Sequence, residues 1–97
     1  MKTQIVKLMS TEDIICGYEE RDGKCFFNKP AKIAMFPTEN GGLGMAIMPW
    51  IPFSDAIEIE INKESILSIM DPSEDVRNEY SQRFGSGIVT PKKEILI

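Results

Sequence analysis

The chain has 97 residues, of which 42% are hydrophobic and 27% are charged, and this composition is typical of one small globular domain. It contains no histidine, which excludes a Ser-His-Asp triad, a Cys-His nucleophile pair and a histidine-ligated zinc site. The 15 acidic residues outnumber the 11 basic ones and give a net charge of −4, which disfavours binding to nucleic acid through bulk positive charge.

Cysteine usage and the lengths of the apolar stretches predict a cellular location. Cys16 and Cys25 are too few for a disulfide scaffold and favour a reducing compartment. The first residues lack the basic and apolar regions of a secretory leader. The longest apolar stretch, residues 45–53, is about half as long as a membrane span and is interrupted by proline. We therefore expect a soluble, cytoplasmic protein that does not contact a membrane.

The clearest local pattern is a β-hairpin that follows a short strand candidate over residues 4–9. Within residues 14–27, Asp22-Gly23 is a preferred two-residue turn. Centring the turn on this dipeptide gives four cross-strand pairs: Arg21–Lys24, Glu20–Cys25, Glu19–Phe26 and Tyr18–Phe27. The apolar residues then share one face of the hairpin: Ile14, Cys16, Tyr18, Cys25 and Phe27. The two cysteines lie apart along this face, so we expect core thiols and no disulfide between them.

A second hairpin follows. Residues 31–36 continue as a strand that Pro37 breaks, and Asn40-Gly41 is a second turn dipeptide before a returning strand over residues 43–48. The next five residues, 49–53, read Pro-Trp-Ile-Pro-Phe. Because proline cannot donate a ladder hydrogen bond, this run predicts a sheet edge or a bulged segment.

The remaining strands are short. Alternating isoleucine and glutamate predict a half-buried strand over residues 57–61, with one face in water. A tight connection at residues 62–64 leads to a last strand over residues 66–69. Short strands that follow one another this closely are typical of small barrels or strongly bent sheets.

One helix is predicted after the last strand. Asp71 can cap it, Pro72 suits its first position, and Glu74 completes a capping-box-like arrangement. An apolar stripe recurs every four residues: Val76, Tyr80 and Phe84. Gly85 and Gly87 end the helix, and an apolar-ended tail follows.

These patterns predict one mainly β domain. We expect residues 1–70 to form a small barrel or a strongly bent sheet of five short strands. We expect residues 71–97 to form a C-terminal helix and tail packed on the same domain.

No group of residues predicts catalysis. The glycine-rich residues 41–44 lack the Gly-Lys-Ser/Thr ending of a phosphate-binding loop and are better explained as a hairpin turn. Asp71, Glu74 and Asp75 do not have the spacing of a calcium loop, and acidic residues in a first helical turn are explained by the helix dipole. Glu58 and Glu60 share a strand face without a third polar partner. We expect no enzyme activity, no catalytic residue, no metal and no cofactor.

The segment from residue 45 to residue 53, called here the Trp50 segment, carries soft and aromatic side chains: Met45, Met48, Trp50, Ile51 and Phe53. Methionine and aromatic side chains are enriched in the cores of interfaces. The segment therefore either completes the core of the barrel or forms an oligomer or partner interface, and the sequence leaves both alternatives open.

The order of these parts over residues 4–70 resembles the Sm-like family, which includes the Sm and LSm proteins and bacterial Hfq. It looks closest to the small Sm-like proteins of phages. The shared parts are the first strand, the hairpin with Asp22 at its turn, the long third strand, and a final strand pair joined by a short turn at residues 61–66. The resemblance implies a strongly bent five-stranded barrel whose edge strands pair between subunits to close a ring.

The resemblance also implies a ligand and a place for it. The family typically binds RNA near the pore, through the loop after the second strand and the loop between the last two strands. By motif position, the RNA-binding residues would be Asp22, Lys24, Asn62 and Lys63. The chain departs from the family because Asn62-Lys63 replaces the usual Arg-Gly or Lys-His pair, and because the predicted helix follows the last strand.

The leading hypothesis is therefore a non-enzymatic, ring-forming Sm-like protein that binds single-stranded RNA weakly at its pore. The alternative is an interaction or structural module that docks another protein through the Trp50 segment. A monomeric SH3-like or OB-like barrel is a third hypothesis.

Overall fold

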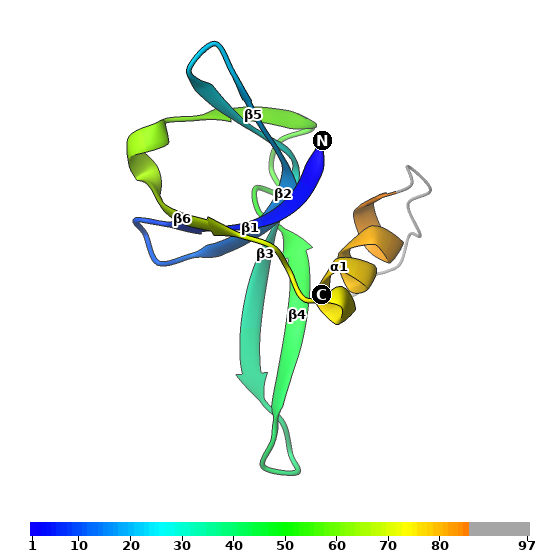
Figure 1. Cartoon of the computed structure of the whole chain (residues 1–97). Helices are drawn as coiled ribbons and strands as arrows, with labels where there is room; N and C mark the ends of the chain where they lie inside the picture. Colours follow the sequence, from blue (N-terminus) through cyan, green and yellow to red (C-terminus); the bar gives the residue numbers. More distant parts are fainter. Residues whose placement is uncertain (86–97) are drawn as a thin grey trace.

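The computed structural model describes residues 1–85 (Figure 1). Its elements follow in this order: β1 (Lys2–Leu8), β2 (Asp13–Arg21), β3 (Lys24–Pro37), β4 (Leu43–Pro49), β5 (Glu58–Ile61), the 3₁₀ turn η1 (Lys63–Ser65), β6 (Ile66–Met70), α1 (Glu74–Tyr80) and the π-helical turn η2 (Ser81–Gly85). The expectation of a mainly β fold with one helix after the last strand is confirmed. No helix in the described range has the length and apolar character needed to cross a membrane.

All strand pairs are antiparallel and form one curling sheet (Figure 1). Its strand order is β4-β3-β2-β1-β6, and β5 pairs with β3 beside this path. The prediction of five strands closed into a barrel is corrected in two respects. The described residues contain six strands, because residues 50–57 separate β4 from β5 on their common partner β3. The sheet is not closed into a barrel, because the strand path ends at β4 and at β6.

The first hairpin is formed as predicted. Its register contains all four expected pairs, from Arg21↔Lys24 to Tyr18↔Phe27. Asp22 and Gly23 both have positive φ, 53° and 78°, which is the conformation that a two-residue hairpin turn requires at both central positions. The local dipeptide therefore sets the register, and the register decides which side chains of β2 and β3 face the core.

The long strand β3 changes partner at Lys29. Residues 25–28 pair with β5 and residues 31–37 pair with β4. Between them, Lys29 has a φ of 50°, in the left-handed region that few L-residues adopt. On the opposite strand, the β2–β3 register shifts between Ile15 and Gly17. This irregularity lets β3 continue from the body of the sheet into a projecting arm, whose two-stranded part, residues 34–46, points away from the body (Figure 1).

The two faces of the sheet bury two separate apolar clusters. The inner cluster contains Val6, Leu8, Ile14, Cys16 and Phe27. The second cluster lies under α1 and contains Ile15, Ala31, Ile47 and Tyr80. Cys16 and Cys25 are both fully buried and both free, which confirms the prediction of two core thiols without a disulfide.

The helix begins later than the sequence predicts. Ser73 is the N-cap, and its hydroxyl accepts a hydrogen bond from the Val76 N–H. Asp71, the predicted cap, instead accepts from the Gln4 amide and pairs with Lys2 at 3.3 Å. It lies two residues before the cap, because these two residues of β1 hold its carboxylate. Gly87 and the predicted apolar-ended tail lie outside the described residues.

Candidate functional site

A shallow hollow of ≈ 400 Å³ lies where the turn of the first hairpin meets the end of β5. Its lining comes from two segments: Gly23 and Lys24 in the first, and Glu60, Ile61, Asn62 and Lys63 in the second. Three of the four predicted RNA-binding residues, Lys24, Asn62 and Lys63, are thereby brought together. Asp22 adjoins the hollow at the turn but does not line it. The β3–β5 pairing positions the two segments, because Cys25 lies opposite Ile61.

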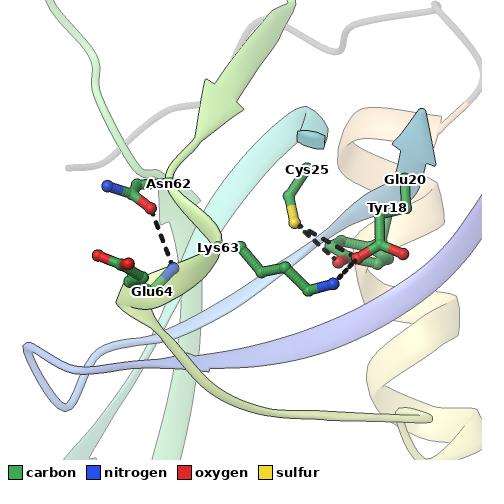
Figure 2. A network of polar contacts seen from close by, with 6 residues as sticks. All are labelled: Tyr18, Glu20, Cys25, Asn62, Lys63 and Glu64. Carbon is green, nitrogen blue, oxygen red and sulfur yellow. Dashed lines mark hydrogen bonds and ion pairs between the residues drawn. The ribbon is translucent and has the colours of Figure 1, made fainter. Parts of the chain in front are cut away.

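Lys63 is paired with a carboxylate that the sequence analysis did not single out. Its Nζ lies 3.0 Å from Oε2 of Glu20 (Figure 2). Glu20 stands opposite Cys25 in the hairpin, so it shares the face of Tyr18 and Cys25 at the rim of the inner cluster. The hydrogen bond and charge of Glu20 raise the pKa of the Lys63 ammonium, which therefore stays protonated. The alternation of the hairpin gives the face on which Glu20 lies, but only the β3–β5 pairing brings Lys63 to it.

Asn62 has a structural task in the turn. Its side-chain oxygen accepts a hydrogen bond from the Glu64 N–H at 3.0 Å, which caps η1 (Figure 2). Its own carbonyl accepts from the Ser65 N–H at 2.9 Å. These bonds fix the backbone that presents Lys63, so the Asn62 amide oxygen is already engaged by the protein.

A polar chain continues from Lys63 toward the interior. The Tyr18 hydroxyl donates to Sγ of Cys25 at 3.2 Å, and Sγ lies 3.8 Å from Oε2 of Glu20 (Figure 2). Burial, followed by the contact with Cys25, raises the pKa of the Tyr18 hydroxyl. Within residues 1–85, the charges of Lys24 and Lys63 at the hollow are matched by those of Glu60, which lines it, and Glu20, which pairs with Lys63.

The Trp50 segment is divided between interior and surface. Trp50 is half-buried, and its ring lies 6.1 Å from that of Phe27 between centroids. The backbone N–H of Trp50 donates to the Pro30 carbonyl at 3.2 Å. Phe53, in contrast, is 96% exposed. The other three predicted interface residues are also exposed: Met45, Met48 and Ile51.

The two terminal strands of the sheet share an unusual composition. β4 reads LGMAIMP and β6 reads ILSIM, so neither carries a charged side chain. Leu43 on β4 is 71% exposed and Leu67 on β6 is 58% exposed. Edge strands are usually protected by charged residues, and β5, which also pairs on one side, carries two glutamates. The edges of β4 and β6 are therefore the least protected in the described sheet.

Comparison with known proteins gives no assignment, because no protein-family profile matches the chain and no curated protein sequence is significantly similar to it.

Proposed function

We propose that the chain is an Sm-like subunit that assembles head to tail, with the β6 edge of one copy pairing with the β4 edge of the next. The observation that carries this proposal is the pair of uncharged, apolar, single-partnered strands at the two ends of the sheet. An unprotected edge is an association hazard unless it is used. The short turn η1 between β5 and β6 and the curl of the sheet support the resemblance to the Sm-like family.

Head-to-tail contacts close into rings when the rotation between copies allows it. The two proposed surfaces are different, so each copy offers one of each. Neither strand brings a charge into the contact, so no charged side chain of either strand is desolvated. The exposed side chains of both edges leave water when the strands pair, which supplies the driving force.

The assembly test uses a lysine on either edge. Met45→Lys on β4 and Ile69→Lys on β6 should each weaken assembly at least about ten-fold, because each buries a charge in the contact. Analytical ultracentrifugation from one to one hundred micromolar measures the effect. Asn40→Lys, at the exposed tip of the arm, adds the same charge away from both edges and is the control.

Mixing the two variants tests the head-to-tail geometry. Met45→Lys retains an intact β6 edge, and Ile69→Lys retains an intact β4 edge. An equimolar mixture should therefore form one good contact and give dimers but no ring. A monomeric wild-type protein would contradict the proposed assembly, and a mixture that forms no dimer would contradict the proposed pairing of edges.

The second candidate function is weak binding of single-stranded RNA, favoured by the gathering of Lys24 and Lys63 at one hollow. In a ring, these lysines would repeat around the pore. Because Glu60 lines each hollow and Glu20 pairs with Lys63, affinity should be low and should fall only gently with salt. Lys63→Ala should weaken binding, whereas Glu20→Gln should strengthen it by releasing Lys63 from its ion pair.

Fluorescence anisotropy with short uridine-rich and adenine-rich RNAs, at low and moderate salt, measures this binding. Glu39→Gln, at the exposed arm, removes one negative charge away from the hollow and is the control for Glu20→Gln. An absence of binding at low salt, or binding that Lys63→Ala leaves unchanged, would favour the alternative of a protein-docking module. The exposed Phe53 ring is the observation that favours that alternative.

A further inference from the structure

The outward edge of β4 can be identified from the hydrogen bond at its end. The Trp50 N–H donates to the Pro30 carbonyl of β3. Peptide groups alternate in direction along a strand, and the β3–β4 register runs without a shift over the whole of β4. Residues of odd number in β4 therefore direct their peptide groups away from β3: Leu43, Met45, Ile47 and Pro49.

The turn η2 occupies part of this edge through Arg83. Nη1 of Arg83, in η2, donates a hydrogen bond to the Ile47 carbonyl at 3.2 Å. Nε of the same guanidinium donates to Oε2 of Glu79 at 3.1 Å, which holds the side chain in place. Pro49 has no N–H to offer a partner strand. The half of the β4 edge nearest the body is therefore closed, while Leu43 and Met45 still offer their peptide groups on the outer half.

Two further hydrogen bonds hold the end of α1 and η2 beside the sheet. The Tyr80 hydroxyl donates to the Lys29 carbonyl at 2.8 Å, and the Lys29 ammonium donates to the Phe84 carbonyl at 3.1 Å. The Arg83 side chain itself is 56% exposed. A charged contact in water contributes little to stability, so a competing donor can replace it.

We propose that η2 is a displaceable cover of the β4 edge, in which Arg83 takes the place that an N–H of an added strand would occupy. This inference rests on the proposed assembly, whose β4–β6 contact it would regulate. The β6 strand of a second copy must displace the guanidinium to pair along the whole of β4. Arg83 is thus a positioning residue that weakens the association of copies and protects the edge at low concentration.

The test compares association constants by analytical ultracentrifugation of the full chain. Arg83→Met keeps the aliphatic stem and removes the donors, so it should tighten assembly roughly three- to ten-fold, as expected for the loss of one competing exposed hydrogen bond. Glu79→Gln frees the guanidinium from its carboxylate and should shift assembly in the same direction by less. Arg77→Met removes the same charge from the neighbouring helix α1, leaves the hydrogen bond of Arg83 to the Ile47 carbonyl in place, and should leave assembly unchanged.

A second substitution establishes where the gain arises. Adding Ile69→Lys to Arg83→Met should abolish the tighter association, because the incoming edge is then blocked. Assembly that is unchanged or weaker in Arg83→Met would overturn the cover while leaving the proposed assembly intact. Monomers in both wild type and Arg83→Met would overturn both proposals. Assembly of Arg83→Met alone would support the cover and would overturn the proposed assembly of the wild-type chain at these concentrations.

Discussion

The two cysteines show how position within the sheet controls side-chain chemistry. Burial raises the pKa of the Cys16 thiol to about 12. The thiolate is the reactive form, so burial keeps the Cys16 thiol protonated and unreactive at pH 8. Cys25 is equally inaccessible and receives the Tyr18 hydroxyl on its sulfur.

We expect neither cysteine of the folded protein to react with a thiol reagent at pH 8 within minutes, and both to react in strong denaturant. The reagent is a disulfide that releases a coloured thiol when it reacts, so absorbance measures the reaction. Ser10→Cys, on an exposed turn, should be labelled at once and is the control. Rapid labelling of the folded wild type would show that one of the strands carrying these cysteines opens readily.

Asp71 gives a pH-dependent prediction. The hydrogen bond from Gln4, and then the contact with Lys2, hold the pKa of its carboxyl below the ordinary 3.8. A depressed folded-state pKa stabilises the protein above the unfolded-state value, and this contribution is lost as the pH falls through the folded-state pKa. Asp71→Asn should therefore lower the melting temperature slightly at pH 7, and the difference from wild type should narrow below pH 3.8. A difference in melting temperature that stays constant down to pH 2 would show that the charge of the Asp71 carboxylate does not contribute to stability.

At the scale of elements, α1 is anchored to the bend in β3. The Tyr80 hydroxyl donates to the Lys29 carbonyl at 2.8 Å and also lies 3.3 Å from the carbonyl oxygen of Asn28. A ring hydroxyl at this point links the helix to the place where β3 changes partner, and burial raises the pKa of that hydroxyl. The helix is thereby attached through a polar contact as well as through the apolar cluster beneath it.

Tyr80→Phe should lower the free energy of unfolding by about 1 kcal/mol, because it leaves backbone acceptors without a donor. Tyr18→Phe is the matched comparison and should cost less, since its acceptor is a sulfur atom, which accepts hydrogen bonds weakly. Urea denaturation followed by tryptophan fluorescence measures both. Equal losses of unfolding free energy in the two variants would show that the hydrogen bond of Tyr80 to β3 stabilises the protein no more than that of Tyr18 does.

The elements that the sequence predicts well are those set by neighbouring residues. Asp22-Gly23 determines its own turn, and the turn then determines the pairs beside it. The N-cap at Ser73 was missed because Asp71 satisfies the same local pattern, and only the contact of Asp71 with β1 removes it from the helix. Lys29 could not be predicted, because no lysine signals a left-handed conformation and the bend arises from pairing with two different strands.

The candidate site shows the same division. The motif positions indicated Lys24, Asn62 and Lys63, and these three residues do meet at one hollow. They meet because Lys24 begins β3 and the other two follow β5, which pairs with β3. The roles of the side chains were less predictable. Asn62 is engaged in its own turn, and Lys63 is neutralised by a glutamate 43 positions earlier in the chain. Such pairings depend on how strands meet rather than on local sequence.

At the scale of the whole molecule, the two aromatic residues of the Trp50 segment should contribute differently to stability, because Trp50 packs against the core and Phe53 lies in water. Trp50→Ala should remove its ring from Phe27 and lower the free energy of unfolding by about 2–4 kcal/mol, as for other large apolar truncations. Phe53→Ser should leave stability nearly unchanged, because the ring is in water. Thermal unfolding distinguishes them. A stability loss in Phe53→Ser as large as that in Trp50→Ala would show that the segment packs as one unit.

The bend at Lys29 also has a mechanical consequence. Beyond Ile33, where the pairing of β3 with β2 ends, residues 34–46 form a regular two-stranded ladder closed by one turn. Adding two residues to each strand would move the tip outward by about 7 Å and keep every existing side chain on its own face. The arm can therefore serve as a lever of adjustable length, and its reach can change without any change in the core that supports it.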